Sequence, residues 1–304
     1  MKFSRARAFS LQFVLPVLVL AAYGIWSAGA DDFYFPTLGT IATQFADTWL
    51  FERFRSDLVP SLLRFGAGYL LAVVAGVVVG IALGLSRTAQ LAAEPIVEFL
   101  RALPAPALIP FALLLFGTGD SSKVFIIALG TVWPILLNTL DGVRGLESQQ
   151  LDMARSYQIP FSARLLHIII PAASPRIFAG MRTSLGIGII LMVVSEMVAS
   201  TNGLGYFILD AQRGFAIPEM WTGIVLIGII GYLLNWLFLR IEGRVLRWHR
   251  GSKGLLADDA RSSTSGTADP ASITAAPTTA SAVTPDPVST APSTERSPRA
   301  ASPS

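Results

Sequence analysis

The sequence predicts an all-α protein that crosses a lipid bilayer with six helices. Hydrophobic residues make up 52% of its 304 residues and charged residues only 14%, whereas soluble domains carry about 25% charged residues. Six stretches are nearly free of charge and have lengths suited to a helix in a bilayer. Lysine and arginine are also distributed unequally among the segments between these stretches, which is typical of multi-pass membrane proteins.

The first predicted span covers residues 9–27. It follows a basic start and belongs to an uncharged run of about 22 residues, which is enough to cross a bilayer. Ala28-Gly29-Ala30 also fits a signal-peptide cleavage site, so removal of this segment stays open as the alternative. Charge-poor runs define the other predicted spans, which are 65–85, 102–116, 124–140, 177–199 and 220–239.

Loop charges predict that both ends of the chain lie in the cytoplasm. With the N-terminus inside, most arginines and lysines fall on the inner side, and the few on the outer side are diluted by Asp and Glu. The chain then divides into a cytoplasmic N-terminus, 1–8, and a membrane domain, 9–250, which includes a long cytoplasmic loop, 141–176. Residues 251–304 are rich in Ala, Ser, Thr and Pro, which predicts a disordered cytoplasmic tail.

Composition excludes several classes of chemistry. The chain has no cysteine and only two histidines, His167 and His249, which are too few for a thiolate- or histidine-based metal site. A net charge of +3 gives no support to nucleic-acid binding. No G-x-x-x-x-G-K-[ST] phosphate loop occurs, and the scattered Asp and Glu form no catalytic cluster. We therefore expect no enzyme activity, no metal, no cofactor and no nucleic-acid partner.

The second span carries a ladder of small residues with a spacing of four: Gly68, Ala72, Gly76, Gly80 and Gly84. This spacing places them on one face of a helix. Small residues let a neighbouring backbone approach closely, which is how helices pack in lipid. The ladder predicts close packing within one subunit, with a subunit interface as the alternative.

The third span contains prolines, among them Pro104 and Pro110, which remove backbone donors and disfavour helix in the preceding residues. A broken helix at membrane depth is tolerated where it is buried in protein or lines a water-filled path. The prolines therefore predict a segment beside a translocation pathway. A simple bend at the cytoplasmic entrance is the alternative.

Glu196 is the most informative charge inside a predicted span. An ionised side chain at mid-bilayer costs about 2.5–3.5 kcal/mol on insertion scales, so such residues face the protein interior or a cavity. We predict that Glu196 lines an outer gate or pairs with a basic residue, and a glutamate that reaches the membrane interface is the alternative. Asn138 and Ser195 are weaker pathway candidates, since interhelical hydrogen bonds explain them equally well.

The long cytoplasmic loop predicts a short helix over residues 146–157. Leu151, Ala154 and Tyr157 recur at i, i+3 and i+6, and the segment is too short and too polar to span a bilayer. It fits a helix that lays one face into a groove of a partner protein. A generic amphipathic linker is the alternative. A second basic and apolar segment, 161–170, is predicted to end at Pro171.

The loop also resembles the cytoplasmic signature of permeases in bacterial ATP-binding-cassette importers. That signature reads E-A-A, three residues, G, nine residues, I, one residue, L-P, and this chain matches its spacing. Further segments resemble the branch that imports sulfonates, taurine and nitrate-like anions. The matches to the signature are D-M-A at 152–154, Q at 158 and I-x-I-P at 168–171. The segments that resemble the branch are S-L-L-R at 61–64, L-R-A-L-P-A-P-A-L-I-P at 100–110, F-G-T-G at 116–119, P-I-L-L-N-T at 134–139, M-A-R-S-Y at 153–157 and N-G-L-G-Y at 202–206.

The resemblance implies a type I importer permease fold whose 152–158 helix is a coupling helix seated in a separate ATPase. It also implies a second permease copy, most often the same chain, an extracytoplasmic solute-binding protein, and location in the bacterial inner membrane. Asp152 is one methylene shorter than the usual Glu, and Gln158 replaces a helix-ending Gly. We therefore expect the helix to end differently, with Pro160 as the stop. The coupling residues carried over are Asp152, Met153, Ala154, Arg155, Tyr157, Gln158, Ile168 and Pro171.

Two other function classes fit the sequence less well. A secondary transporter driven by an ion gradient needs several ionisable residues at the bilayer midplane, and this chain offers little beyond Glu196. A membrane-embedded enzyme needs clustered acid, base or nucleophile side chains. The sequence therefore favours a permease subunit that forms the pathway for a small solute.

Overall fold

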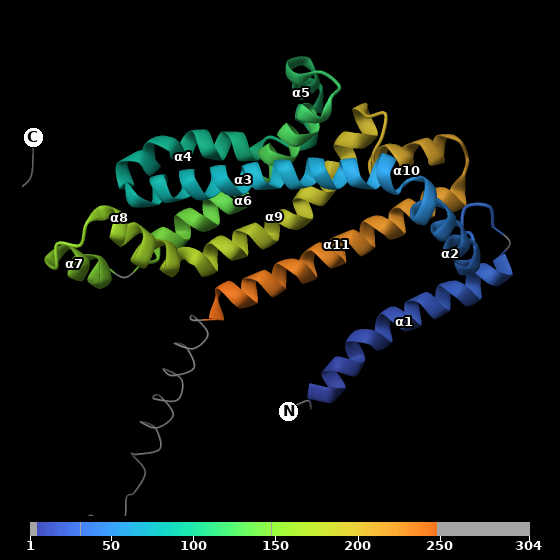
Figure 1. Ribbon diagram of the computed structural model, residues 1–304, viewed down its shortest axis with the longest axis horizontal. Coiled ribbons are helices and arrows are strands. Elements are labelled where there is room, and N and C mark those ends of the chain that lie inside the picture. The colour runs from blue at the N-terminus through green and yellow to red at the C-terminus, as the bar shows by residue number, and fades with distance from the viewer. Residues whose placement is uncertain (1–4, 31, 147, 248–304) are drawn as a thin grey trace, which may run out of the picture. The chain divides into compact units, whose positions relative to one another are not determined.

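A computed structural model describes residues 5–30, 32–146 and 148–247, and every regular element in them is a helix (Figure 1). The predicted all-α class is thereby confirmed. The predicted disordered tail, 251–304, lies outside the described residues, as do the first four residues of the predicted cytoplasmic N-terminus.

Five long helices coincide with predicted spans; α1, α6 and α11 extend beyond them at both ends, and α3 and α9 only at the N-terminal end. Their charged end residues fall outside the charge-free runs from which the spans were predicted. Four of the five, together with the helical turns that adjoin them, are long and apolar enough to cross a membrane. The long helices are α1 (Arg5–Ala30), α3 (Val59–Leu85), α6 (Asp120–Arg144), α9 (Ile170–Ala199) and α11 (Ile217–Val245).

The predicted third span, 102–116, is wrong in its extent. The structure instead has three elements in this region: α4 (Arg87–Ala102), a short turn of 3-10 helix η3 (Ala105–Leu108), and α5 (Ile109–Phe116). The chain bends by 85° between α4 and the segment formed by η3 and α5. Charged residues recur along α4 and interrupt every apolar run, so the search for charge-free segments missed this helix. If the bent pair counts as one span, the structure has up to five spans by length and composition, and the number six stays a prediction.

Short helices join the long ones. Thr37 caps the N-terminus of α2 (Leu38–Asp47), because its side-chain oxygen accepts a hydrogen bond from the backbone N–H of Thr40. Ser86 does the same for α4 through the N–H of Ala89, at 3.2 Å. The short elements between α1 and α3 and between α9 and α11 are α2 (Leu38–Asp47), η1 (Thr48–Glu52), η2 (Phe54–Leu58) and α10 (Leu204–Arg213).

Pro171 does not end a helix, which corrects the prediction for the segment 161–170. The chain runs from α8 (Phe161–Arg164) through a π-helical turn, η4 (Leu165–Ile169), directly into α9. In this turn the N–H of Ile170 bonds to the carbonyl of Leu165, five residues back. The wider turn accommodates a proline in the first turn of α9, where a backbone N–H is not needed.

The glycine ladder of α3 packs against α6 within the chain, as predicted. A Cβ atom on Gly68 would lie 2.8 Å from Ile127, and one on Gly80 would lie 2.7 Å from Thr139. Such distances are shorter than real Cβ contacts, so a larger side chain would push the two helices apart. In Figure 1, α3, α6 and α9 accordingly run side by side.

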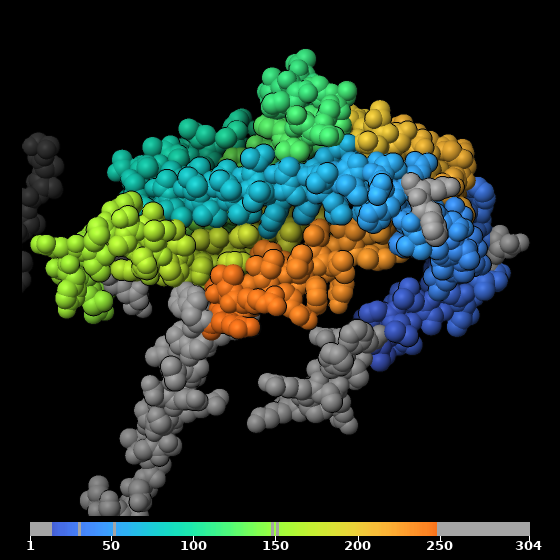
Figure 2. Space-filling view, viewed as in Figure 1, coloured from blue at the N-terminus to red at the C-terminus, as the bar shows by residue number. Residues whose placement is uncertain are grey.

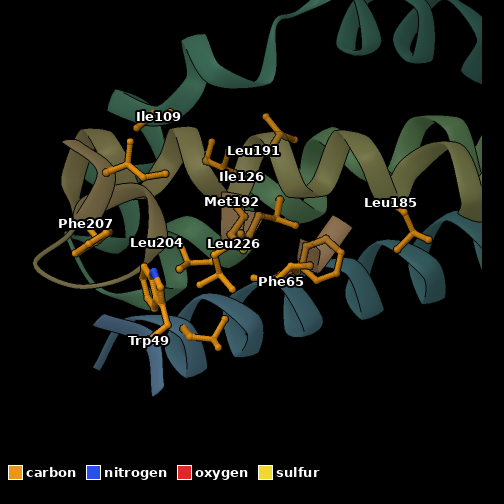
Figure 3. Close-up of a cluster of buried hydrophobic side chains, with 14 of the residues drawn as sticks. Trp49, Phe65, Ile109, Ile126, Leu185, Leu191, Met192, Leu204, Phe207 and Leu226 are labelled. Carbon is orange, nitrogen blue, oxygen red and sulfur yellow. The ribbon is translucent and has the colours of Figure 1, made fainter. Parts of the chain in front are cut away.

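The main hydrophobic core lies where α10 meets the long helices (Figure 3). The rings of Trp49 and Phe207 meet edge to face with centroids 4.8 Å apart. The indole N–H of Trp49 donates to the hydroxyl of Thr222 at 3.0 Å, so this buried polar atom is satisfied. The core anchors η1 and α10 to α11 and defines one end of the bundle, which we call the α10 end. The opposite end carries α7 (Ser148–Ser156) and is called the α7 end.

Candidate functional site

Arg64 lies at the centre of a polar network at the α10 end, in which Arg64 and Glu196 are buried and Asp120 is 70% exposed. The Arg64 side chain is 5% exposed, and its guanidinium donates to the carboxylate of Glu196 at 2.9 Å and to that of Asp120 at 2.7 Å. It also donates to the side-chain oxygen of Asn202 at 2.5 Å and to the Asn202 carbonyl at 3.1 Å. One side chain of α3 thus ties together α6, α9 and the turn before α10. We call these four residues the Arg64 network.

The carboxylate of Glu196 is fully buried and satisfied by donors on three sides. Besides Arg64, the hydroxyl of Ser61 lies 2.8 Å from both carboxylate oxygens, and the backbone N–H of Gly205 donates at 3.0 Å. The Ser61 hydroxyl in turn accepts the N–H of Leu204 at 2.8 Å. Charge and hydrogen bonds together offset the cost of burying this carboxylate.

The same groups satisfy the start of α10. Three successive backbone N–H groups, those of Gly203, Leu204 and Gly205, donate to Asp57, Ser61 and Glu196 respectively. The first N–H groups of a helix have no partner within it, and negative side chains there are favourable. The N-terminus of α10 is therefore held by side chains that come from η2, α3 and α9.

Gly203 is required where it stands. Its φ of 113° lies in a region that L side chains rarely adopt, and a Cβ atom would lie 2.6 Å from the carboxylate carbon of Glu196. The glycine lets the turn close over the buried carboxylate. The first four residues of the N-G-L-G-Y segment, 202–205, therefore each have a structural explanation.

The predicted pathway candidates of α6 and α9 are held inside the chain. The side chain of Glu196 is 0% exposed and has a basic partner. The hydroxyl of Ser195 donates to the Met192 carbonyl of the preceding turn, and the amide of Asn138 donates to the carbonyl of Pro134. Their hydrogen bonds thus run to groups of the same chain, and a role in the pathway stays a prediction.

The sequence reading missed the residues that surround Glu196. Arg64 directly precedes the predicted span 65–85, and Asp57 and Asp120 lie outside all predicted spans, so the sequence predicts no contact between them and Glu196. The available signal was the pairing of S-L-L-R in one segment with N-G-L-G in another, since a buried carboxylate needs both a cation and backbone donors. Nothing in sequence spacing shows that residues 132 positions apart, Arg64 and Glu196, meet.

At the α7 end, the structure leaves apolar side chains uncovered. Met153 is 59% exposed and Tyr157 is 77% exposed, whereas Ala154 between them is 1% exposed. Asp152 and Arg155 form an ion pair at 3.4 Å, with both side chains about two-thirds exposed. Such a pair contributes little to stability. The helix predicted over 146–157 is confirmed as α7, with shorter bounds.

Gln158 adopts the left-handed backbone conformation with φ 53°. The sequence predicted another helix end here, because this conformation disfavours residues other than glycine. Its N–H bonds to the carbonyl of Arg155, and the N–H of Ile159 bonds to that of Ala154. These two bonds form the Schellman motif, which usually has glycine at this position. The expectation that the helix ends differently is wrong, because the backbone keeps the glycine geometry and tolerates about 1–2 kcal/mol of strain. Pro160 follows as the N-cap of α8.

The remaining residues that are predicted to take part in coupling lie in the segment that leads into α9. Ile168 is half-buried in η4, beside the fully buried Ile169. Pro171 occupies the first turn of α9 and is also half-buried. These two residues therefore shape the backbone that carries α7, while Met153 and Tyr157 present the exposed surface.

The break between α4 and α5 lines a cavity of about 300 Å³. Pro106 contributes to its wall, whereas Pro104 and Pro110 are exposed and are not among its lining residues. The opposite wall comes from the middle of α6, at Gly130 and Trp133, and from the C-terminal half of α9, at Leu191. Arg101, the next-to-last residue of α4, is the charged group at this cavity.

Residues 72–248 match the family model described as "Binding-protein-dependent transport system inner membrane component". The chain is 31% identical over 247 residues, 79% of its length and 88% of the relative's, to SsuC of Bacillus subtilis (strain 168), provisionally named an aliphatic sulfonates transport permease protein. It is 33% identical to the nitrate import permease protein NrtB of Leptolyngbya laminosa, with 62% of this chain and 68% of that protein covered. It is 34% identical to the taurine transport system permease protein TauC of Escherichia coli (strain K12), with coverage of 63% and 70%.

The fold is also similar to that of a solved transporter. A chain from the inward-facing MetNI methionine ABC transporter superposes with a TM-score of 0.53, at 21% sequence identity. The match covers 65% of this chain and 97% of that one. At this level of identity the likeness concerns the fold alone.

Proposed function

The chain belongs to the family of binding-protein-dependent transport system inner membrane components, and on that premise we propose that it passes a small oxyanion inward across the bacterial inner membrane. It is the permease subunit of an ATP-binding-cassette importer, as the signature around residue 154 predicted. The relatives named for sulfonates, nitrate and taurine share a substrate with an anionic oxygen group. That shared chemistry supports the substrate class.

We assign the coupling role to α7. Met153 and Tyr157 are exposed on a helix whose backbone ends in a complete Schellman motif, so the helix is formed before any partner covers it. Exposed apolar side chains on a short preformed helix suit a groove of a partner protein. This exposure is the observation that carries the proposal. The partner is a separate ATPase, since the sequence has no phosphate loop.

The α7 end then faces the cytoplasm and the α10 end faces outward, where a solute-binding protein delivers the anion. A second permease copy completes the pathway. Closure of two ATPase subunits on ATP would draw the two α7 helices together, and the long helices would transmit that movement through the membrane. Both chain termini lie in the cytoplasm in this arrangement, as the loop charges predict.

Reconstitution of the complete transporter tests this function. The permease is placed in liposomes together with its ATPase and its solute-binding protein, and uptake of labelled taurine, nitrate and an alkylsulfonate is measured. We expect uptake of at least one of these anions that requires internal ATP and is blocked by vanadate. Uptake that survives vanadate and collapses with an uncoupler would instead identify a secondary transporter.

A second arm tests the role of α7. The double change Met153→Asp and Tyr157→Asp should abolish ATP-driven uptake, because it places two charges in an apolar contact. Met153→Leu combined with Tyr157→Phe, which keeps both exposed positions apolar, is the matched control and should keep ATP-driven uptake. Undiminished uptake by the double aspartate variant would remove the coupling role from this helix.

A further inference from the structure

One face of α4 carries a stripe of polar and charged residues that the transport assignment does not explain. The residues recur at intervals of three or four positions: Arg87, Gln90, Glu94, Glu98 and Arg101. This spacing places them on the same side of the helix. None of the residues of α4 is buried in the chain. In Figure 2, α4 forms an open part of the surface beside α3.

The stripe ends at the middle of the bundle. Arg101 shares its cavity with Gly130 and Trp133, which lie near the midpoint of the 25-residue α6. Its guanidinium donates to Glu98 at 2.6 and 2.9 Å, and the two side chains are 46% and 54% exposed. A charged residue at this depth in a membrane faces the bundle interior or water and marks a substrate path by default.

The backbone at this point also requires water or protein around it. Between α4 and α5 the helical hydrogen-bond pattern is interrupted, and Pro104, Pro106 and Ala107 are exposed. Irregular backbone at membrane depth does not face lipid. The cavity of about 300 Å³ next to it is large enough for a small solute and lies at the lower end of the usual range for ligand pockets.

A second, smaller cavity continues along α4 toward the α7 end. Gln90, Glu94 and Glu98 line it on one side, and Asp141 of α6 lies on the other. Glu98 therefore belongs to this cavity while its ion-pair partner Arg101 belongs to the first. The charge along α4 changes from positive at Arg101, at the middle of the bundle, to negative at Glu98 and Glu94, and it is positive again at Arg87, the first residue of the helix.

We propose that Arg101 is the residue that binds the substrate anion inside the membrane, and that the anion displaces Glu98 from the guanidinium. This inference rests on the proposed function for its substrate class. The planar guanidinium donates in pairs to sulfonate, nitrate or carbonate oxygens. The other lining residues are mainly apolar, which suits the short carbon chain of an alkylsulfonate. The carboxylates of Glu98 and Glu94 then repel the anion, so that binding stays weak enough for release.

The natural chain is well suited to a test because it has no cysteine. A single cysteine at Ala105, which lines the cavity, is introduced into the complete transporter in liposomes without ATP. Two thiol reagents of similar size are compared, the anionic methanethiosulfonate ethylsulfonate and the cationic methanethiosulfonate ethyltrimethylammonium. Mass spectrometry of this chain alone gives the two rates, so cysteines in the partner subunits do not interfere.

We expect Ala105→Cys to react with both reagents and to favour the anionic one. Adding Arg101→Gln should lower the ratio of anionic to cationic rate about tenfold, because one nearby positive charge is removed. Arg101→Lys keeps the charge and should keep the ratio. Ethanesulfonate, used as the competing anion, should slow the anionic reagent when residue 101 is Arg and should have no effect when it is Gln. Leu114→Cys on α5, an apolar position that is 83% exposed, is the control and should react with neither reagent.

Two results would overturn the proposal. If Ala105→Cys reacts with neither reagent, the cavity is dry, covered by lipid or by a second copy of the chain. If the rate ratio does not change on Arg101→Gln, the charge does not act at this site. Both results are independent of the uptake measurement, so failure of the proposed function, seen as the absence of ATP-driven anion uptake, is recognised separately.

Discussion

The two ends of the helical bundle satisfy their polar and apolar groups in different ways. At the α10 end, Arg64 and Glu196 are buried, and their partners all lie within the same chain. At the α7 end, Met153 and Tyr157 are more than half exposed, and the ion pair of α7 lies in solvent. One end is complete by itself, and the other presents a formed helix with apolar side chains uncovered.

On the proposed function, this difference separates an end that a partner protein can move from an end that is held rigid by its own contacts. A network with a buried charge pair is costly to open, because either partner left alone is an unpaired charge in a low-dielectric environment. The Arg64 network therefore holds α3, α6, α9 and the start of α10 as one unit. A partner protein can bind an exposed helix such as α7 without breaking contacts within this chain. Four substitutions sharpen this contrast through their effects on the stability of the detergent-solubilised chain, either global or confined to α7.

The largest loss is expected for Arg64→Leu. The change leaves the carboxylate of Glu196 buried without its cation, which costs about 3–5 kcal/mol. Chemical unfolding followed by tryptophan fluorescence measures the loss. Arg55→Leu, at an exposed position in the same region, is the matched control and should change stability by less than about 0.5 kcal/mol. Adding Glu196→Gln to Arg64→Leu should restore part of the loss. Equal stability of Arg64→Leu and Arg55→Leu would show that the network is not an anchor.

A smaller loss is expected for Gly203→Ala. The methyl group would meet the Glu196 carboxylate, and the φ of 113° is strained for alanine, which together cost about 2–3 kcal/mol. The same unfolding experiment measures it. Gly186→Ala, which meets no atom within 4 Å, provides the control on α9 and should be neutral or slightly stabilising. If both variants unfold alike, the close approach at Gly203 has no energetic consequence.

At the other end, Gln158→Gly should be stabilising, but only locally. Glycine removes about 1 kcal/mol of left-handed strain at the end of α7. Slower hydrogen exchange of the α7 amides should report it, while global unfolding stays unchanged. Gln158→Ala retains a side chain at positive φ and should show no such slowing. Slower exchange in both variants would mean that the glutamine side chain, and not the backbone, sets the stability of α7.

The smallest effect on stability is expected for Tyr157→Asp. The side chain is 77% exposed, so its replacement should change the unfolding free energy by less than about 0.5 kcal/mol. ATP-driven uptake, in contrast, should be lost. A large destabilisation would show that Tyr157 packs within this chain and would end the contrast between the two ends.

The sequence predicted those parts of the fold whose physics is local or repeats at a fixed interval. Charge-free runs gave the five long helices, and the spacing of four in the second span gave the packing of α3 on α6. The coupling segment was found from the spacing of its apolar residues and its resemblance to a known signature. Each of these features can be read within about thirty residues of chain.

The rest depended on contacts that no spacing reveals. The sequence did not predict α4 because Glu94, Glu98 and Arg101 interrupt its apolar runs along the chain. The same charged residues carry the proposal for the binding of the anion. Arg64 was visible as a charge, but its partner Glu196 lies on another helix. Pro171 and Gln158 were read from local propensity, and in both cases the surrounding structure imposes the backbone conformation that propensity disfavours.

A single cross-linking measurement tests most directly whether the ATPase acts on the α7 end. The chain without natural cysteines receives one cysteine, at Tyr157 on the α7 end or at Arg213 on the α10 end, and the assembled transporter is treated with a short reagent that joins a thiol to an amine. The account predicts a cross-link to the ATPase from Tyr157→Cys that slows ATP-driven uptake, and none from Arg213→Cys. A cross-link to the ATPase from residue 213, with none from residue 157, would contradict it.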